Sequence, residues 1–236
     1  MNAPIASLLI AAALHGGPAA AQDKAAVPAG AEAQASDKKL AELIERYNKE
    51  RSEVIAAYQK AETEEERGKI IAKLPGKGYI PEFRAVAEEA KGTDTAARAW
   101  MWVLRLADDD PKQAWEVVEL LLSEHMQSPA LDELSGELRY ASYTHGEARV
   151  IEALRSIVSE SPHERVRAGA LFTLGAVLLE SDKAKNKEEG RDCFEAVIAE
   201  YGKLSYGSSS TYEAAATGYL YELDHLQIGM PAPDFQ

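Results

Sequence analysis

Few side chains in this 236-residue sequence have the types and spacing that metal or phosphate chemistry requires. The five histidines are scattered and form no H-x-x-x-H or H-E-x-x-H pattern, which would place two zinc ligands on one helix face. They are His15, His125, His145, His163 and His225. Gly76, Lys77 and Gly78 form a cationic glycine loop, but no G-x-x-x-x-G-K-S/T framework surrounds it. Neither a metal site nor a phosphate site is therefore predicted.

Acidic and thiol groups offer two further candidates for chemistry. Asp108–Asp110 could bind a cation, but the cluster stands directly before Pro111, where a carboxylate caps the start of a helix. The single cysteine, Cys193, excludes an intramolecular disulfide, a C-x-x-C redox pair and a cysteine-rich zinc site within this chain. Its place beside Phe194 on an apolar helix face favours a buried packing thiol over a reactive one. No catalytic residue and no cofactor are predicted, and enzyme chemistry within these residues is disfavoured.

Aromatic residues are the remaining candidates for a binding role. Trp100, Trp102 and Trp115 lie close together in the sequence, and seven of the ten tyrosines lie from Tyr140 onward. Such side chains can line a groove that binds a peptide or protein partner. In helical proteins they serve more often in core and inter-helix packing. The sequence leaves both interpretations open.

Composition limits the classes of partner. The chain carries 39 acidic and 26 basic residues, for a formal net charge of -13, and no basic cluster that could neutralise several phosphates. Nucleic acid is therefore not an expected partner. No run after residue 21 approaches the ~18 apolar residues that a membrane-spanning helix needs, so no membrane span is expected in the mature chain.

Periodic apolar residues predict helices through most of the chain. Ser36 or Asp37 is expected to cap a long first helix, and Thr63 with Glu66 has the S/T-x-x-E spacing of a capping box for the second. Pro81 suits the first turn of the third. The first helix has apolar positions at helical spacing, with charged residues between them. They are Leu40, Leu43, Ile44, Tyr47, Val54, Ile55 and Tyr58.

Helix start signals then recur at a regular distance. Thr93, Ser128 and Ser161 each begin a unit of two amphipathic helices, and these starts are 35 and 33 residues apart. A period near 34 residues with two helices per period is typical of an α-solenoid of the tetratricopeptide type. The sequence thus predicts an all-α fold, an antiparallel helix-hairpin stack with an irregular C-terminal tail. Capping pairs are predicted within and after these units, at Asp110 with Gln113, Thr144 with Glu147, Ser161 with Glu164, and Ser210 with Glu213.

The third unit, residues 161–201, is the clearest of these hairpins. It resembles a tetratricopeptide repeat at Leu171, Leu174, Gly175, Leu178, Gly190, Phe194 and Val197. It differs from that repeat in about three extra turn residues and in lacking the usual closing proline. The resemblance implies two helices packed back to back, each repeat covering the apolar face of its neighbour.

The N-terminal residues differ in composition from the helical part. Residues 1–21 carry no Asp, Glu, Lys or Arg, run apolar from Ile5 to Leu14 and end in three alanines, an A-x-A type cleavage signal. They are interpreted as a signal peptide, although no Lys or Arg precedes the apolar run. Residues 22–36 are rich in Ala, Pro, Gly and Gln and predict a disordered linker. The helical domain is assigned to residues 37–225.

The last residues, 226–236, leave the helical pattern because two prolines forbid its continuation. This segment resembles the opening of the thioredoxin-fold domain in peroxiredoxins and TlpA-like thiol-disulfide oxidoreductases, which reads I-G-x-x-A-P-D-F. The matching residues are Ile228, Gly229, Ala232, Pro233, Asp234 and Phe235. Exported redoxins of this kind can carry a preceding helical module, which is similar to this chain in a T-x-E-E-R step, here Thr63 to Arg67.

The resemblance implies a function that the helices themselves do not encode. The chain would be a non-catalytic interaction domain ahead of a redoxin domain, and the whole product would be an exported, periplasmic or cell-envelope redox protein. The strand and the W-C-x-x-C motif that the family places next are absent from these residues, so no catalytic residue is carried over. The alternative is a free-standing exported scaffold that binds protein or peptide partners in a groove lined by Trp100, Trp102 and nearby tyrosines.

Overall fold

The computed structural model describes residues 29–107, 109–181 and 183–227 of the chain. These residues are almost entirely helical, which confirms the predicted all-α fold. The α-helices are α1 (Ala29–Lys60), α2 (Glu64–Ile71), α3 (Ile80–Glu89), α4 (Asp94–Leu106), α5 (Pro111–Glu124), α6 (Leu134–His145), α7 (Glu147–Glu160), α8 (Glu164–Glu180), α9 (Ala184–Tyr201) and α10 (Tyr212–His225). The shorter elements are the 3₁₀ helices η1 (Lys77–Tyr79) and η2 (Pro129–Glu133), and the strands β1 (Ser205–Tyr206) and β2 (Ser210–Thr211).

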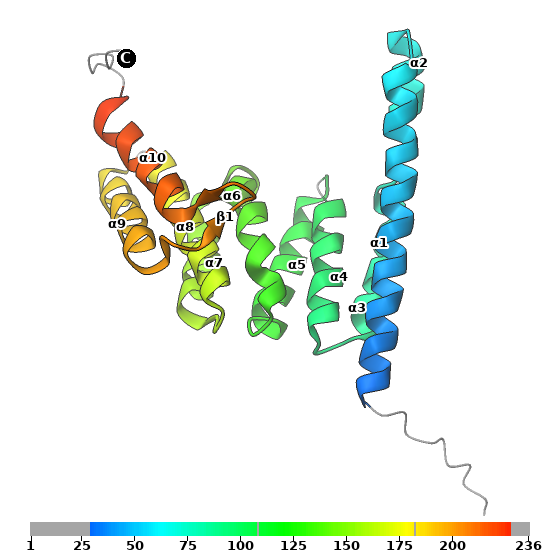
Figure 1. Ribbon diagram of the computed structural model, residues 1–236, viewed down its shortest axis with the longest axis horizontal. Coiled ribbons are helices and arrows are strands. Elements are labelled where there is room, and N and C mark those ends of the chain that lie inside the picture. Colours follow the sequence, from blue (N-terminus) through cyan, green and yellow to red (C-terminus); the bar gives the residue numbers. More distant parts are fainter. Residues whose placement is uncertain (1–28, 108, 182, 228–236) are drawn as a thin grey trace, which may run out of the picture.

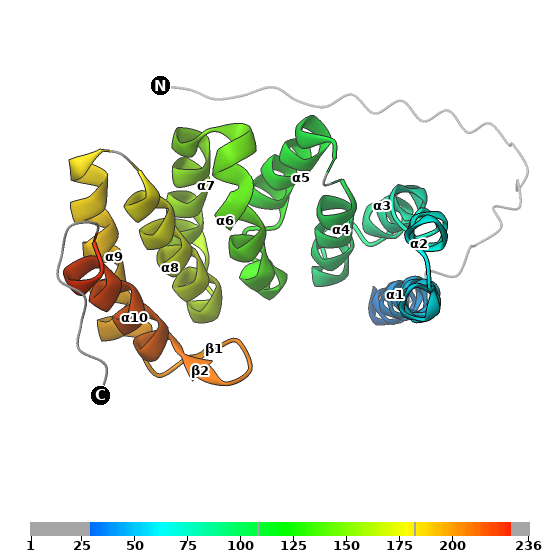
Figure 2. The same cartoon turned by 90° about the horizontal axis from the view of Figure 1, so that it is seen from above.

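The helices lie side by side in chain order, with α1 at one end of the molecule and α9 and α10 at the other (Figure 1). Helix α1 is much longer than its neighbours and projects beyond them together with α2. In the view from above, α1, the β1–β2 hairpin and α10 lie on one side of the row, and α5 and α7 lie on the other (Figure 2). The 34-residue solenoid repeat stays a prediction from the sequence.

Two groups of buried apolar side chains hold the helices together. The larger core extends from α1 to α9, and its fully buried members include Leu40, Phe83, Leu121, Leu154 and Leu178. The second core lies where α8, α9 and α10 meet, and comprises Ala168, Phe172, Ala176, Phe194, Val197, Tyr201, Tyr212 and Ala216. Each fully buried large side chain contributes about 1.5–3 kcal/mol of transfer free energy. The second core therefore gives the C-terminal helices a packing centre of their own.

Several predicted helix starts are confirmed because they depend on local chemistry alone. Thr63 and Glu66 form the expected capping box, with Glu66 N–H donating to Thr63 Oγ1 at 3.2 Å and Thr63 N–H donating to Glu66 Oε2 at 3.3 Å. Thr93 caps α4 and Asp110 caps α5 through the same kind of bond, from a backbone N–H to a side-chain oxygen. Pro81 lies in the first turn of α3, as predicted.

The capping pair predicted between Thr144 and Glu147 does not form. Thr144 is still inside α6, where its hydroxyl donates to the Ala141 carbonyl at 3.2 Å. Gly146 then ends α6 with a φ of 86°, a left-handed conformation that favours glycine, and α7 begins at Glu147. The turn is made by the glycine, so the threonine lies two residues too early to cap the next helix.

Two other predicted caps are displaced. Ser161 adopts extended backbone at the end of α7, as a residue before proline prefers, and α8 begins only at Glu164 with His163 in the N-cap position. Ser210 and Thr211 both pair in the small sheet, and Thr211, the residue directly before α10, accepts the N–H that caps the helix in place of Ser210. In both cases the helix starts later than the S/T-x-x-E spacing predicted.

Helix α1 begins at Ala29, before the predicted cap at Ser36 or Asp37. The linker predicted for residues 22–36 is therefore wrong from residue 29 onward. Residues 29–36 include four alanines, and alanine has the highest helix propensity of all residues. An established helix can extend backwards through such a segment, in which Ala33, Gln34 and Ala35 are exposed and Ser36 is buried. None of the helices in the described residues is long and apolar enough to cross a membrane.

Candidate functional site

Three neighbouring hollows form an elongated groove on one face of the molecule. A hollow of about 370 Å³ lies between α1, α4 and η2, and is called the α4 hollow. A pocket of about 430 Å³ follows between η2, α6, α8, the hairpin and α10, and is called the central pocket. A third hollow of about 420 Å³ lies between α8, α9 and α10, and is called the α10 hollow. The central pocket shares Asp132 and Glu133 with the first hollow and Arg139 and Tyr219 with the third, so neighbouring hollows have walls in common.

Helices α6 and α8 supply the two long walls of the central pocket through side chains at helical spacing. On α6 the lining residues are Ser135, Gly136, Arg139 and Tyr140. On α8 they are Arg165, Gly169, Phe172 and Thr173. Residues three and four apart lie on one face of a helix, so each set presents a single stripe to the pocket. The remaining wall comes from the hairpin and α10, through Ser205, Tyr206, Gly207, Tyr212 and Tyr219.

Aromatic rings pack around Phe172 and shape this wall. The ring centroid of Phe172 lies 4.7 Å from that of Tyr206, 5.7 Å from that of Tyr212 and 5.4 Å from that of Tyr219. These separations are within the range of favourable edge and tilted contacts. Tyr140 and Tyr206 also present their rings to solvent, at 69% and 39% exposure. The pocket therefore has a rigid aromatic wall with two tyrosines at its rim.

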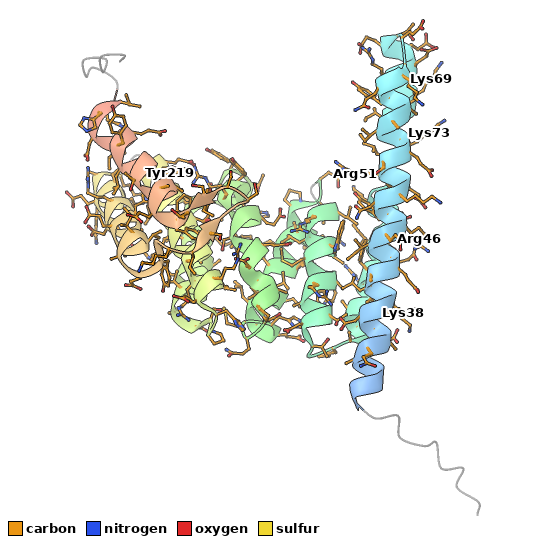
Figure 3. All side chains as sticks on the ribbon, in the orientation of Figure 1. Lys38, Arg46, Arg51, Lys69, Lys73 and Tyr219 are labelled. Atoms are coloured by element: carbon orange, nitrogen blue, oxygen red, sulfur yellow. The ribbon has the colours of Figure 1, made fainter. Side chains whose placement is uncertain are left out.

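Tyr219 connects the pocket to the second core. Its ring stacks on Phe194 at a centroid distance of 4.7 Å, and the Arg139 guanidinium lies over it at 5.6 Å. Figure 3 shows Tyr219 at the α10 end of the molecule, away from the basic side chains Lys38 and Arg46 of α1. Packing below the ring and a cation beside it fix this side chain between the central pocket and the α10 hollow.

The polar groups of the central pocket are only partly paired. Arg139 donates from Nη2 to Glu180 at 2.6 Å, and its buried Nε–H has no acceptor among the described residues. Arg165 donates from Nε to Asp132 at 2.5 Å. Ser135, only 3% exposed, has an Oγ with no hydrogen-bond partner in the described part of the chain. Unpaired buried polar groups of this kind are uncommon and costly, and two of the three in the described residues line this pocket; the third is Arg84 Nε.

Burial fixes the protonation state of the tyrosine beside these groups. Tyr212 is buried, and desolvation raises the pKa of its hydroxyl to about 12. The neighbouring Asp132 raises this pKa further and Arg165 opposes it. The phenol therefore stays protonated throughout the neutral range and can donate a hydrogen bond.

The groove differs in charge from the protein as a whole. Its three hollows are lined by five cations and four carboxylates, whereas the chain carries 26 basic and 39 acidic residues. The cations are Arg98, Arg105, Arg139, Arg165 and Lys187. The net charge of the protein is -13, so an anionic group is repelled less strongly in the groove than on the rest of the surface.

The three tryptophans singled out in the sequence are separated by the fold. Trp102 is half-buried, lines the α4 hollow, and stacks on Phe83 with ring centroids 5.1 Å apart. Trp100 is half-buried with the Arg84 guanidinium 5.8 Å from its ring. Trp115 is buried in the main core. Trp102 thus lines one of the three hollows, and Trp115 lines a further hollow of about 260 Å³ between α4, α5 and α6. The six motif residues from Ile228 to Phe235 lie outside the described residues.

The other candidates for chemistry have structural partners. Lys77 of the glycine loop forms an ion pair with Asp109, and Asp110 caps α5. His125 is buried, which lowers the pKa of its imidazole, and the His145 ring packs 4.9 Å from that of Trp115. No cluster of three or more potential metal ligands occurs within residues 29–107, 109–181 and 183–227.

Cys193 is buried against α8, as the sequence predicted, and its chemistry follows from that position. Burial, together with the negative charges of Glu189 and Asp192, raises the pKa of the thiol to about 11. At pH 8 only about one thiol in a thousand is ionised, and the thiolate is the reactive form. We expect an aromatic disulfide reagent to label native Cys193 more than about a hundredfold more slowly than the denatured chain at the same pH. Labelling of the native protein at the denatured rate would contradict this burial.

Most residues of the central pocket were not identified from the sequence. Ser135, Arg139 and Gly169 occur on helices whose polar faces look alike in sequence, and nothing local distinguishes them. The tyrosines from Tyr140 onward carried a signal, because that enrichment includes Tyr206, Tyr212 and Tyr219 of the pocket. Comparison of the chain with protein-family models, with curated proteins and with solved structures found no match.

Proposed function

We propose that this chain is a non-catalytic interaction domain that holds a linear segment of a partner protein in its groove. The succession of three hollows with shared walls carries this proposal, because such a row fits an extended chain better than a small molecule. Aromatic residues and arginine line it, and both are enriched where proteins bind each other. The half-buried rings are held by packing, so little side-chain entropy would be lost on binding.

A plug in the central pocket tests this proposal. A Cβ placed on Gly136 meets no atom within 4 Å, so Gly136→Trp can fill the pocket without disturbing α6. Gly68→Trp is the matched control, because Gly68 is an exposed helical glycine on α2, with the same open space and outside the groove. We expect peptides selected from a random display library on the native chain to bind Gly136→Trp at least about tenfold more weakly and Gly68→Trp unchanged.

Fluorescence anisotropy with the labelled selected peptides measures both affinities. Equal binding to the native chain and to Gly136→Trp would place the binding surface elsewhere and overturn the groove as the site. Far-ultraviolet circular dichroism of each variant confirms that the tryptophan has not unfolded the helices.

We further propose that the domain serves an exported thiol-disulfide oxidoreductase of the cell envelope. Two features of the sequence support this: the redoxin-like segment from Ile228 to Phe235, and the signal-like composition of residues 1–21. The alternative is a free-standing exported scaffold with the same groove. Sequencing of the gene beyond the codon for Gln236 separates them, since the first requires an in-frame W-C-x-x-C motif and a verified stop codon directly after Gln236 supports the second.

A further inference from the structure

We propose that the central pocket binds an acidic side chain of the partner segment, through Ser135, Arg139 and Tyr212. This inference rests on the proposed function and names the chemistry that the groove selects. Three hydrogen-bond donors line one pocket, and none has an acceptor within the described residues: the Ser135 hydroxyl, the Arg139 Nε–H and the Tyr212 hydroxyl. A carboxylate can accept from all three, and bonds between charged groups are about twice as strong as neutral ones.

Two of the donors, the Ser135 and Tyr212 hydroxyls, border a space that a glycine keeps open. A Cβ built on Gly169 of α8 would lie 3.3 Å from the Tyr212 hydroxyl oxygen and 3.4 Å from Ser135 Oγ, so both oxygens border the volume above this residue. Arg139 follows Ser135 by four residues on α6 and therefore lies one turn along the same face. Ser135 of α6 and Tyr212 of α10 thus border the space above Gly169, and the Arg139 guanidinium lies beside it, against Glu180 and Tyr219.

The neighbouring carboxylates repel such a ligand only weakly, because each of them is already paired with an arginine. Asp132 accepts from Arg165, and Glu133 accepts from Arg105. Glu180, on the side of the α10 hollow, accepts from Arg139 Nη2. The Nε–H of Arg139 has no acceptor within the described residues. The groove is lined by five cations and four carboxylates, so it repels an anionic ligand less than the acidic surface of the rest of the protein does.

The position of the pocket indicates which carboxylate it takes. The groove continues on both sides, into the α4 hollow and the α10 hollow, so a bound chain can run through the pocket instead of ending there. An acidic side chain of an internal segment fits this arrangement better than a terminal carboxylate. The exposed rings of Tyr140 and Tyr206 at the rim would contact an apolar side chain two residues away, about 6.5 Å along an extended chain.

Synthetic peptides test the assignment. Each groove-binding peptide from the display selection is prepared with both ends blocked, in its native form and with its acidic residue replaced by the corresponding amide. We expect the amide forms to bind the native chain at least about tenfold more weakly. We expect this preference for the acid to fall to less than about twofold in Arg139→Gln, because the charged donor is gone. Arg155→Gln, which removes an exposed arginine paired with Glu189 outside the groove, should keep the full preference.

Ser135→Ala tests the site with a variant that is expected to fold normally. The variant removes a hydroxyl that has no partner to lose, so the chain should keep its thermal stability while acid-bearing peptides bind about fivefold more weakly. Equal binding of acid and amide forms to the native chain, or an acid preference that survives in Arg139→Gln, would overturn the carboxylate site. Binding that requires a free C-terminus would overturn the internal segment. Peptides that Gly136→Trp excludes but that show no acid preference would refute this inference and leave the groove function intact.

Discussion

Phe194→Ala should lower the free energy of unfolding by about 3–5 kcal/mol, the largest stability effect we expect from a single substitution in this chain. Phe194 has no exposed surface, and its ring centroid lies 4.7 Å from that of Tyr219 and 5.2 Å from that of Phe172. Truncation leaves a cavity where α8, α9 and α10 meet. Urea denaturation followed by circular dichroism measures the loss. Because the cavity removes the support beneath Tyr219, groove-binding peptides should bind more weakly as well.

Tyr221→Ala provides the control on the same helix. Tyr221 is about half exposed and contacts His225 at the surface of α10, so its truncation should change stability by no more than about 0.5 kcal/mol. A loss below 1 kcal/mol for Phe194→Ala would show that this phenylalanine does not hold the second core together. Hydrogen exchange would show where the loss falls, and we expect it to concentrate in α8, α9 and α10.

Gly190→Ala should destabilise the protein by about 1–3 kcal/mol, although alanine is the better helix former. A Cβ on Gly190 of α9 would lie 2.9 Å from the Gly175 carbonyl oxygen of α8 and 3.0 Å from Leu179 Cδ2. These contacts are too close to be tolerated, and the first involves backbone, which cannot rotate away. Helices α8 and α9 would have to separate along their contact. Scanning calorimetry should record a lower melting temperature.

Gly218→Ala is the matched substitution with the opposite expected sign. Gly218 lies within α10, where a new Cβ meets no atom within 4 Å. Replacing a helical glycine by alanine in open space should stabilise the protein by about 0.5–1 kcal/mol. If both variants shifted the melting temperature in the same direction, close approach of α8 and α9 would not be the reason for glycine at position 190.

Local chemistry explains why some helix boundaries could be predicted and others could not. Thr63, Thr93 and Asp110 cap their helices as expected, because a cap needs only a side-chain oxygen and an N–H two or three residues away. The same spacing at Thr144 and at Ser161 formed no such cap. At these two places the backbone decides where the next helix starts. Gly146 adopts a left-handed conformation, and Pro162 holds Ser161 in extended backbone, so neither hydroxyl reaches the N–H that it would cap. Several candidate caps fit one turn, and backbone geometry selects among them.

Burial of aromatic residues shows the limit of sequence patterns for the site. Trp115 and Tyr140 both lie on helices among apolar neighbours, yet Trp115 is buried in the main core and Tyr140 is mostly exposed at the rim of the central pocket. Helical periodicity gives the face on which a side chain lies. It does not say whether another helix covers that face. The tryptophans therefore looked like equal candidates, yet Trp102 lines the α4 hollow, Trp115 lines a different hollow between α4, α5 and α6, and Trp100 lines neither.

The sequence by itself determined the helical class, many of the helix starts and the burial of Cys193. These follow from hydrophobic periodicity and capping, which depend only on residues close together in the sequence. Only the tertiary structure decided the central pocket, since Ser135, Gly169 and Tyr212 belong to three different helices and meet through packing. The Ser135 and Tyr212 hydroxyls lack partners within the described residues because of how α6, α8 and α10 pack. No local pattern encodes that arrangement, which depends on how the helices pack along the whole row.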